Sequence, residues 1–125
     1  GGKDLPAIGM AIGIERLSLL SNVLEGDKTS ISIIIISNNT EPKAYKIAHD
    51  LRSLNNNINF DIQLSDGSLK SKLRRANKDN ADYAIIIGEE ELKSNTVIVK
   101  PLSDNDSEQT TMDLNDLDNF IKNVE

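Results

Sequence analysis

A nearly unbroken run of isoleucine constrains the fold more than any other feature of this sequence. Five isoleucines lie between Ser30 and Ser37, with little of the alternation between apolar and polar residues that a strand with one solvent-exposed face shows. A strand of this kind is covered on both faces, usually by helices packed on a parallel or mixed sheet. The run is far shorter than the ~20 apolar residues of a membrane helix. It therefore predicts the central strand of an α/β domain and no membrane span.

Beyond this strand the apolar pattern changes several times between the period of a helix and that of a strand. Thr40, Ser68 and Asp113 precede helical stretches and are expected to be their N-caps. On the second helix, Leu69, Leu73 and Ala76 are expected to face inward. The residues 89–93 are compatible with one helical turn. The expected strands are 30–37, 58–64, 83–87, 96–100 and 109–112, and the expected helices are 40–54, 68–78 and 113–124.

This order of elements predicts a mixed sheet of about five strands flanked by about three helices, with right-handed crossovers between parallel strands. The strand 58–64 alternates apolar and polar residues, which is typical of a half-exposed strand nearer the edge of the sheet. Asp66 and Gly67 predict a turn, as does the polar segment 103–106.

Composition excludes several classes of site. With 125 residues the chain has room for one compact domain and a modest core. It has no cysteine, which excludes a disulfide framework, a thiolate zinc site and a cysteine nucleophile. Its single histidine, His49, has polar neighbours and is expected at the surface. The acidic residues Asp104, Asp106 and Glu108 could hold a hard cation loosely, but the spacing of an EF-hand loop is absent, which favours solvated charge.

Three local features point to ligands. Gly9 and Gly13 allow close approach of backbone or ligand, and Arg16 supplies a bidentate donor for phosphate oxygens, although ordinary packing with a solvated charge explains such a pattern equally well. Five cations lie between Lys70 and Lys78 in a chain of net charge −6, which indicates either a polyanion partner or a solvated helix face. The acidic triplet 89–91 either accepts hydrogen bonds from a base or stabilises the start of a helical turn.

Two stretches of the chain resemble one protein family. The stretch from Pro6 to Leu20, PAIGMAIGIERLSLL, resembles motif 3 of the class II aminoacyl-tRNA synthetases, and its sequence is most similar to that motif in the histidyl enzymes. Leu69 to Leu102, LKSKLRRANKDNADYAIIIGEEELKSNTVIVKPL, resembles the anticodon-binding domain shared by the histidyl, threonyl, prolyl and glycyl enzymes. The two motifs occur in the order that the family has them, and together they span most of the chain.

The resemblance implies a parent enzyme that activates histidine with ATP and Mg²⁺ and transfers it to tRNA(His) in the cytoplasm. The chain begins at Gly1 without methionine, so we expect a piece of a longer protein. Residues 1–26 are then a helical remnant of the class II catalytic domain, and residues 27–125 are the anticodon-binding domain. Motifs 1 and 2 are missing, so we expect no catalysis and no cofactor in this chain alone. The parent is expected to be a homodimer through its catalytic domain, and this chain a monomer.

By the same resemblance, individual residues take expected roles. Gly13 lines the adenine side of the ATP site and Arg16 contacts an ATP phosphate, a task that suits a rigid guanidinium. Glu91 and Lys100 contact anticodon nucleotides. The basic helix would hold the RNA backbone or nearby bases through Lys70, Lys72 and Arg75. At Lys72 and Leu73 many histidyl enzymes have Gln and Phe, so this chain departs from the family there.

Other function classes remain as alternatives. A non-charging relative of the synthetases, acting as a regulatory or accessory nucleic-acid-binding module, would share these residues, although Gly13, Glu15 and Arg16 favour the charging enzyme. A phosphoacceptor receiver needs acidic residues at strand ends, but the first strand ends in Ser37, Asn38 and Asn39. A dinucleotide-binding fold needs a glycine-rich turn after that strand, and the sequence has none there.

Overall fold

A mixed five-stranded sheet forms the centre of the structure, a computed structural model that describes residues 6, 8–20, 28–63, 67–103 and 108–124. The strand order is β2-β1-β3-β4-β5, so the isoleucine-rich strand is flanked on both sides, as predicted. The first three strands are parallel, and the last two run antiparallel to their neighbours. The strands are β1 (Thr29–Ile35), β2 (Ile58–Gln63), β3 (Tyr83–Ile87), β4 (Thr96–Pro101) and β5 (Thr110–Asp113).

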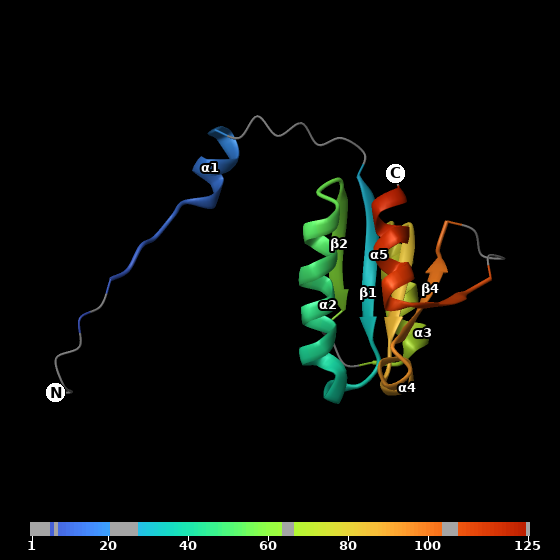
Figure 1. The fold of residues 1–125 in the computed structure, drawn as a ribbon. Coiled ribbons are helices and arrows are strands. Elements are labelled where there is room, and N and C mark those ends of the chain that lie inside the picture. Colours follow the sequence, from blue (N-terminus) through green and yellow to red (C-terminus); the bar gives the residue numbers. More distant parts are fainter. Residues whose placement is uncertain (1–5, 7, 21–27, 64–66, 104–107, 125) are drawn as a thin grey trace.

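Helices cover both faces of the sheet, as Figure 1 shows. Two of them pack on one face and against each other, and a third lies on the opposite face. A short helix follows β3, and a 3-10 turn connects β1 to the first large helix. The helices are α1 (Ile14–Leu20), α2 (Glu41–Leu54), α3 (Leu69–Lys78), α4 (Glu89–Lys93) and α5 (Leu114–Asn123), with the 3-10 turn η1 at Asn38–Thr40.

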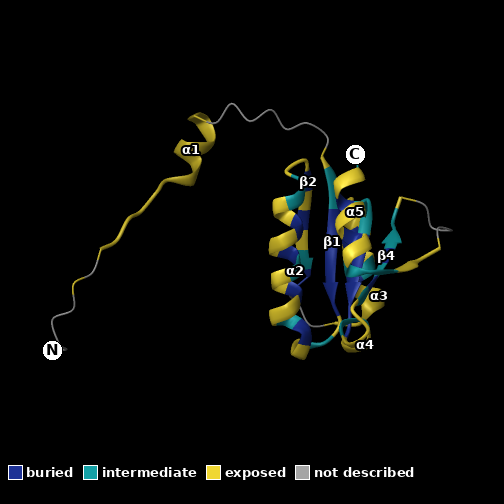
Figure 2. Cartoon of the chain, viewed as in Figure 1, coloured by how far each residue is buried: buried dark blue, intermediate teal, exposed yellow. Residues whose placement is uncertain are grey.

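The core has two unequal parts because β1 points alternate side chains to opposite faces. Ile31, Ile33 and Ile35 join the larger apolar cluster beneath α2 and α5. Ile34 joins a smaller cluster beneath α3 with Ala84 and Ile86 of the neighbouring strand. Figure 2 shows β1 buried, apart from its half-buried start, between exposed helix surfaces. This double coverage explains why the strand lacks polar alternation.

All three predicted N-cap positions are confirmed, and two of them have a side-chain capping hydrogen bond. The Ser68 hydroxyl accepts a hydrogen bond from the Ser71 amide at 3.3 Å, and the Asp113 carboxylate accepts one from the Asn115 amide at 2.8 Å. Thr40 is the N-cap residue of α2, as predicted, but its side chain makes no capping hydrogen bond. Its hydroxyl donates to the Ser37 carbonyl at 2.6 Å instead, because η1 tightens the chain just before α2 begins.

The expected inward face of α3 also needs a correction. Leu73 and Ala76 face the sheet, but the Leu69 side chain is 38% exposed. Lys72, expected among the solvated cations, is only 9% exposed. Its Nζ donates a hydrogen bond to the carbonyl oxygen of Ile35 at 2.5 Å. The helix therefore places one ammonium group at the end of β1, where it meets a backbone carbonyl.

The first part of the chain buries none of its described side chains. Ile8, Met10 and Leu19 are among its exposed apolar residues. In the part of the chain that the structure describes, no helix combines the length and apolar character needed to cross a membrane. The predicted turns at Asp66 and at 103–106, and the residues Asp104 and Asp106, fall wholly or partly outside the described residues.

Candidate nucleic-acid interface

Glu91 lies in the first turn of α4, directly after the carboxyl end of β3. Gly88 is the N-cap of this helix and is buried. The Glu91 side chain folds back over Gly88, so that its carboxylate lies at the end of β3 rather than in open solvent. Among the described residues, no hydrogen bond or ion pair reaches this half-buried carboxylate. A carboxylate that no described group satisfies is available to accept hydrogen bonds from a ligand.

Lys100 lies on β4, directly opposite Ala84 of β3. Because side chains alternate along a strand, it shares a face with Ile98, which packs in the cluster beneath α3. The residue is half-buried, and within the described ranges its ammonium has no acidic partner. Lys100 therefore presents a positive charge on the face of the sheet that α3 only partly covers.

Glu91 and Lys100 lie on one face of the sheet but at different levels of it. Gly88, against which the Glu91 carboxylate rests, is four residues beyond Ala84 on the same chain segment. At about 3.3 Å per residue, the two levels are roughly 13 Å apart. This separation suits contacts to different nucleotides of a splayed single strand better than contacts to a single base.

Lys70 lies in the first turn of α3 with an exposed side chain. The helix begins near the carboxyl end of β1, because Lys72 in its next turn reaches the Ile35 carbonyl. Lys70 therefore belongs to the same end of the molecule as Glu91. Lys72 lies between the two in the chain but points into the domain, so its charge is used internally.

Arg75 lies on the opposite side of α3. Its Nε is 3.7 Å from the Asp79 carboxylate, an exposed pair one helical turn apart. Both residues border a polar cleft between α3 and the first halves of β1 and β2. The cleft has a volume of about 280 Å³ and is lined by Ser30, Ser32, Asn59, Asp61, Arg75, Ala76, Asp79 and Ala81. The helix thus separates Arg75 from Lys100 and Glu91.

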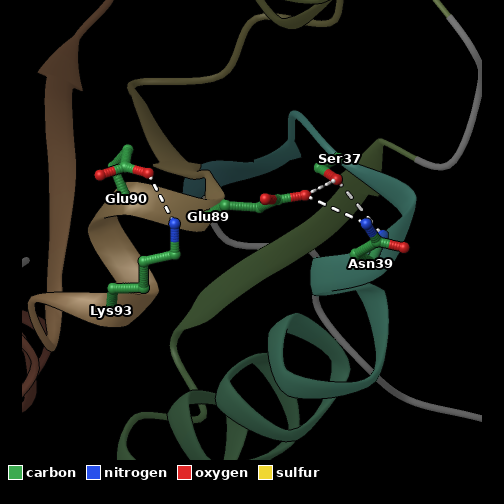
Figure 3. Close-up of polar contacts among 5 residues, drawn as sticks. All are labelled: Ser37, Asn39, Glu89, Glu90 and Lys93. Atoms are coloured by element: carbon green, nitrogen blue, oxygen red, sulfur yellow. Dashed lines mark hydrogen bonds and ion pairs between the residues drawn. The ribbon is translucent and has the colours of Figure 1, made fainter.

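A polar bridge that the sequence did not predict connects the ends of β1 and β3 (Figure 3). Glu89 Oε1 accepts hydrogen bonds from Ser37 Oγ at 2.7 Å and from Asn39 Nδ2 at 3.2 Å. The bond from Ser37, more than the one from Asn39, holds the pKa of the Glu89 carboxyl below its usual value. The only signal in the sequence was that polar residues and an acid follow two adjacent parallel strands. The bridge fixes the loop after β1 against α4.

A second surface contact lies on α4 itself. Lys93 Nζ donates to Glu90 Oε1 at 2.8 Å, which raises the pKa of the lysine. Of the acidic triplet, Glu89 and Glu90 therefore have partners inside the domain, and Glu91 is left for other contacts. The carboxylates that stabilise α4 and the carboxylate that faces the sheet are thus different residues.

The remaining candidates lie elsewhere or form no cluster. His49 is exposed on α2, as expected. Gly13 directly precedes α1, and a Cβ built on it would lie 3.9 Å from the Arg16 side chain. Both residues are exposed, and Figure 1 draws α1 apart from the sheet. In the described ranges, no three His, Cys, Asp or Glu side chains lie close enough together to hold a metal ion.

Comparisons with known proteins agree on the family. The model of the anticodon binding domain family matches residues 30–124. A histidine–tRNA ligase of Ruthia magnifica subsp. Calyptogena magnifica is 39% identical over 126 residues, which cover 98% of this chain and 30% of that protein. The enzyme of the same name from Vesicomyosocius okutanii subsp. Calyptogena okutanii (strain HA) is 37% identical over the same shares. The chain spans about 30% of the length of these relatives.

Solved structures share the fold. A histidyl-tRNA synthetase from Nostoc sp. PCC 7120 superposes with a TM-score of 0.67 at 23% identity, over 87% of this chain and 26% of that one. Apo histidyl-tRNA synthetase of S. aureus gives a TM-score of 0.65 at 26% identity, over 87% and 28%. The RNA binding domain of threonyl-tRNA synthetase from Cryptosporidium parvum Iowa II gives 0.66 at 19% identity, over 75% and 22%.

The match of the family model covers the sheet, except for the first residue of β1, and the helices on both of its faces. Glu91 and Lys100, for which the described residues supply no partner, both lie inside the matched region, on the face that α3 partly covers. Sequence and fold thus lead to the same family, and the chain belongs to the anticodon-binding domains of aminoacyl-tRNA synthetases.

Proposed function

We propose that this chain is the anticodon-binding part of a histidyl-tRNA synthetase and that it recognises the anticodon of tRNA(His). The observation that supports this most directly is the pair of half-buried charges, Glu91 and Lys100, which lack partners among the described residues and share one face of the sheet. A carboxylate accepts hydrogen bonds from base amino and ring N–H groups, while an ammonium holds phosphate or base oxygens. Together the two side chains complement the N–H donors and the oxygen acceptors that an unstacked RNA strand exposes.

In this proposal the cations of α3 have different tasks. Lys70 is exposed at the end of the helix nearer Glu91 and holds the RNA backbone. Lys72 does not contact RNA and instead stabilises the end of β1 through its hydrogen bond to the Ile35 carbonyl. Arg75, on the far side of the helix beside Asp79, reaches RNA only where the strand passes over the helix itself.

The parent protein is proposed from the relatives, of which this chain spans about 30%. It would attach histidine to tRNA(His) with ATP and Mg²⁺ in the cytoplasm, as a homodimer through a catalytic domain that lies outside this chain. Residues 1–26 would belong to that catalytic domain and residues 27–125 to the anticodon-binding domain. Gly13 and Arg16 would then complete an ATP site only together with the rest of the catalytic domain.

The alternative, a non-charging synthetase-like module, is less well supported. The curated relatives that match nearly the whole chain carry the name histidine–tRNA ligase. Their similarity extends across the first part of the chain, which contains Gly13 and Arg16, because the matches cover 98% of this chain.

Binding of the full 125-residue chain to a histidine tRNA anticodon stem-loop tests the proposal. Phosphate contacts predict a linear fall of log affinity with log salt between about 50 mM and 200 mM, and base contacts predict a preference over a scrambled anticodon. Glu91→Ala should weaken the preference, and Lys100→Ala should weaken binding. Asp118→Ala and Lys122→Ala, both exposed on α5, are the matched controls and should change neither. Equal binding to both loops would contradict anticodon recognition.

A further inference from the structure

The backbone of Gly88 does not require a glycine. The residue has φ −120° and ψ −179°, an extended conformation that any amino acid adopts. It follows β3 and is buried, an environment in which small apolar residues are common. The reason for a glycine at this position must therefore lie in what occupies the space of the missing side chain.

The Glu91 carboxylate takes up that space. A Cβ added to Gly88 would collide with Glu91 Oε2 and would lie 3.6 Å from Ile36 Cδ1. The clashing atom is the far end of a flexible side chain rather than backbone. An alanine at this position would therefore displace the carboxylate and leave the strand and helix in place.

Ile36 forms the apolar side of the same small surface. It continues the isoleucine run one residue past β1, yet its side chain is 51% exposed. It lies beside the Gly88 position on the face of the sheet that α3 partly covers, next to the Glu91 carboxylate. An exposed aliphatic surface beside an unpaired carboxylate matches an unstacked nucleobase, which offers a flat apolar face and an edge with N–H donors.

We infer that Gly88 is a specificity-determining residue, whose missing Cβ lets the Glu91 carboxylate lie over the end of β3 and read the edge of one RNA base that rests on Ile36. The inference rests on the proposed function, because it assigns the geometry behind anticodon discrimination. Gly88 acts here as a positioning residue, since it touches the carboxylate and not the base. Ile36 is the residue that contacts the base directly.

The test is Gly88→Ala in the full chain, with the histidine anticodon stem-loop and stem-loops that each change one anticodon base. Because the base edge loses the carboxylate that accepts its hydrogen bonds, we expect a loss of roughly 10-fold in the preference for the cognate loop. The salt dependence should stay unchanged, because no phosphate contact is touched. Gly9→Ala is the matched control, since nothing lies within 4 Å of a Cβ added there.

A double-mutant cycle separates positioning from a general structural effect. If Gly88 acts through the carboxylate, Gly88→Ala combined with Glu91→Ala should discriminate no worse than Glu91→Ala alone. Ile36→Ala is the second variant and should lower affinity for all loops that place a base there, with an unchanged salt slope and an unchanged thermal midpoint.

The outcomes distinguish the inference from the proposed function. Full discrimination by Gly88→Ala, or losses that multiply in the double variant, would overturn the inference while the proposed function stands. Wild-type binding that ignores the anticodon would refute the proposed function and the inference together. Loss of discrimination only in Gly88→Ala, Glu91→Ala and their combination, with Gly9→Ala like wild type, would support it.

Discussion

Lys70 and Lys72 are two residues apart on α3, yet the structure gives their charges opposite environments. The Lys70 side chain is exposed, whereas the Lys72 ammonium is buried against the Ile35 carbonyl oxygen at 2.5 Å. Replacing each with methionine keeps the aliphatic stem and the helix propensity and removes only the charge. Lys70→Met and Lys72→Met are therefore a matched pair that separates RNA binding from folding.

The magnitude for Lys72→Met follows from the buried bond. A hydrogen bond to a charged donor contributes about 1.5–3 kcal/mol, and relief of the buried charge offsets part of its loss. We expect the free energy of unfolding to fall by about 1–2 kcal/mol. For a domain of this size that lowers the thermal midpoint by roughly 5–15 °C. For Lys70→Met, a surface substitution, the free energy of unfolding should stay within about 0.5 kcal/mol of wild type.

RNA binding should show the reverse pattern. Removal of one phosphate contact makes the slope of log affinity against log salt less negative by about 0.7 for a single strand. We expect this change for Lys70→Met and no change for Lys72→Met, measured at a temperature where both variants are folded. Urea unfolding gives the stability and fluorescence titrations across a salt series give the slope. If Lys72→Met instead makes the slope of log affinity against log salt less negative and leaves the free energy of unfolding unchanged, the assignment of the Lys72 charge to the interior is refuted.

Three further predictions concern the folded domain. Below about pH 4.3, the usual pKa of a glutamate, the wild type should lose stability as the pH falls through the lowered pKa of Glu89 and its carboxylate becomes protonated. Glu89→Gln should lose less stability over that range, and parallel curves of thermal midpoint against pH for the two proteins would contradict this. Ser68→Ala removes the N-cap of α3 and should cost about 1 kcal/mol in urea unfolding, whereas no loss would mean that the cap is dispensable. Leu117→Ala opens a cavity under the sheet and should cost about 2–5 kcal/mol, and a loss below 1 kcal/mol would show that the helix α5 relaxes into it.

Regular elements were predictable because their signals are local. The isoleucine run indicated a central strand, and β1 is flanked by β2 and β3. The alternating pattern of 58–64 indicated a strand near the edge, and β2 is an edge strand. Ser68 was found as a cap because one hydroxyl and one nearby amide suffice for that motif.

The errors occurred where a residue had two possible environments. The pattern of α3 gave Leu69 an inward position and Lys72 an outward one, but the structure exposes the first and buries the second. The reason is the Ile35 carbonyl at the end of β1, which only the packing of the helix on the sheet brings within reach of the lysine. At Thr40 the N-cap position was predicted correctly, but the tight turn after β1 offered the hydroxyl a carbonyl instead of a helical amide.

The sequence by itself determined the α/β class, the order of the elements and the resemblance that pointed to Glu91 and Lys100, because periodicity, capping residues and motifs are written along the chain. Only the tertiary structure decided which charges remain available to a ligand. It paired Glu89 with Ser37 and Asn39 across two strands, turned Lys72 inward and folded Glu91 over Gly88. Glu89 and Lys72 each bond to a residue of another element, and their distance in space follows from the packing of the sheet and not from their spacing in the sequence. Glu91 and Gly88 are only three residues apart, but the carboxylate reaches the end of β1 beside Ile36 because the sheet places β1 next to β3.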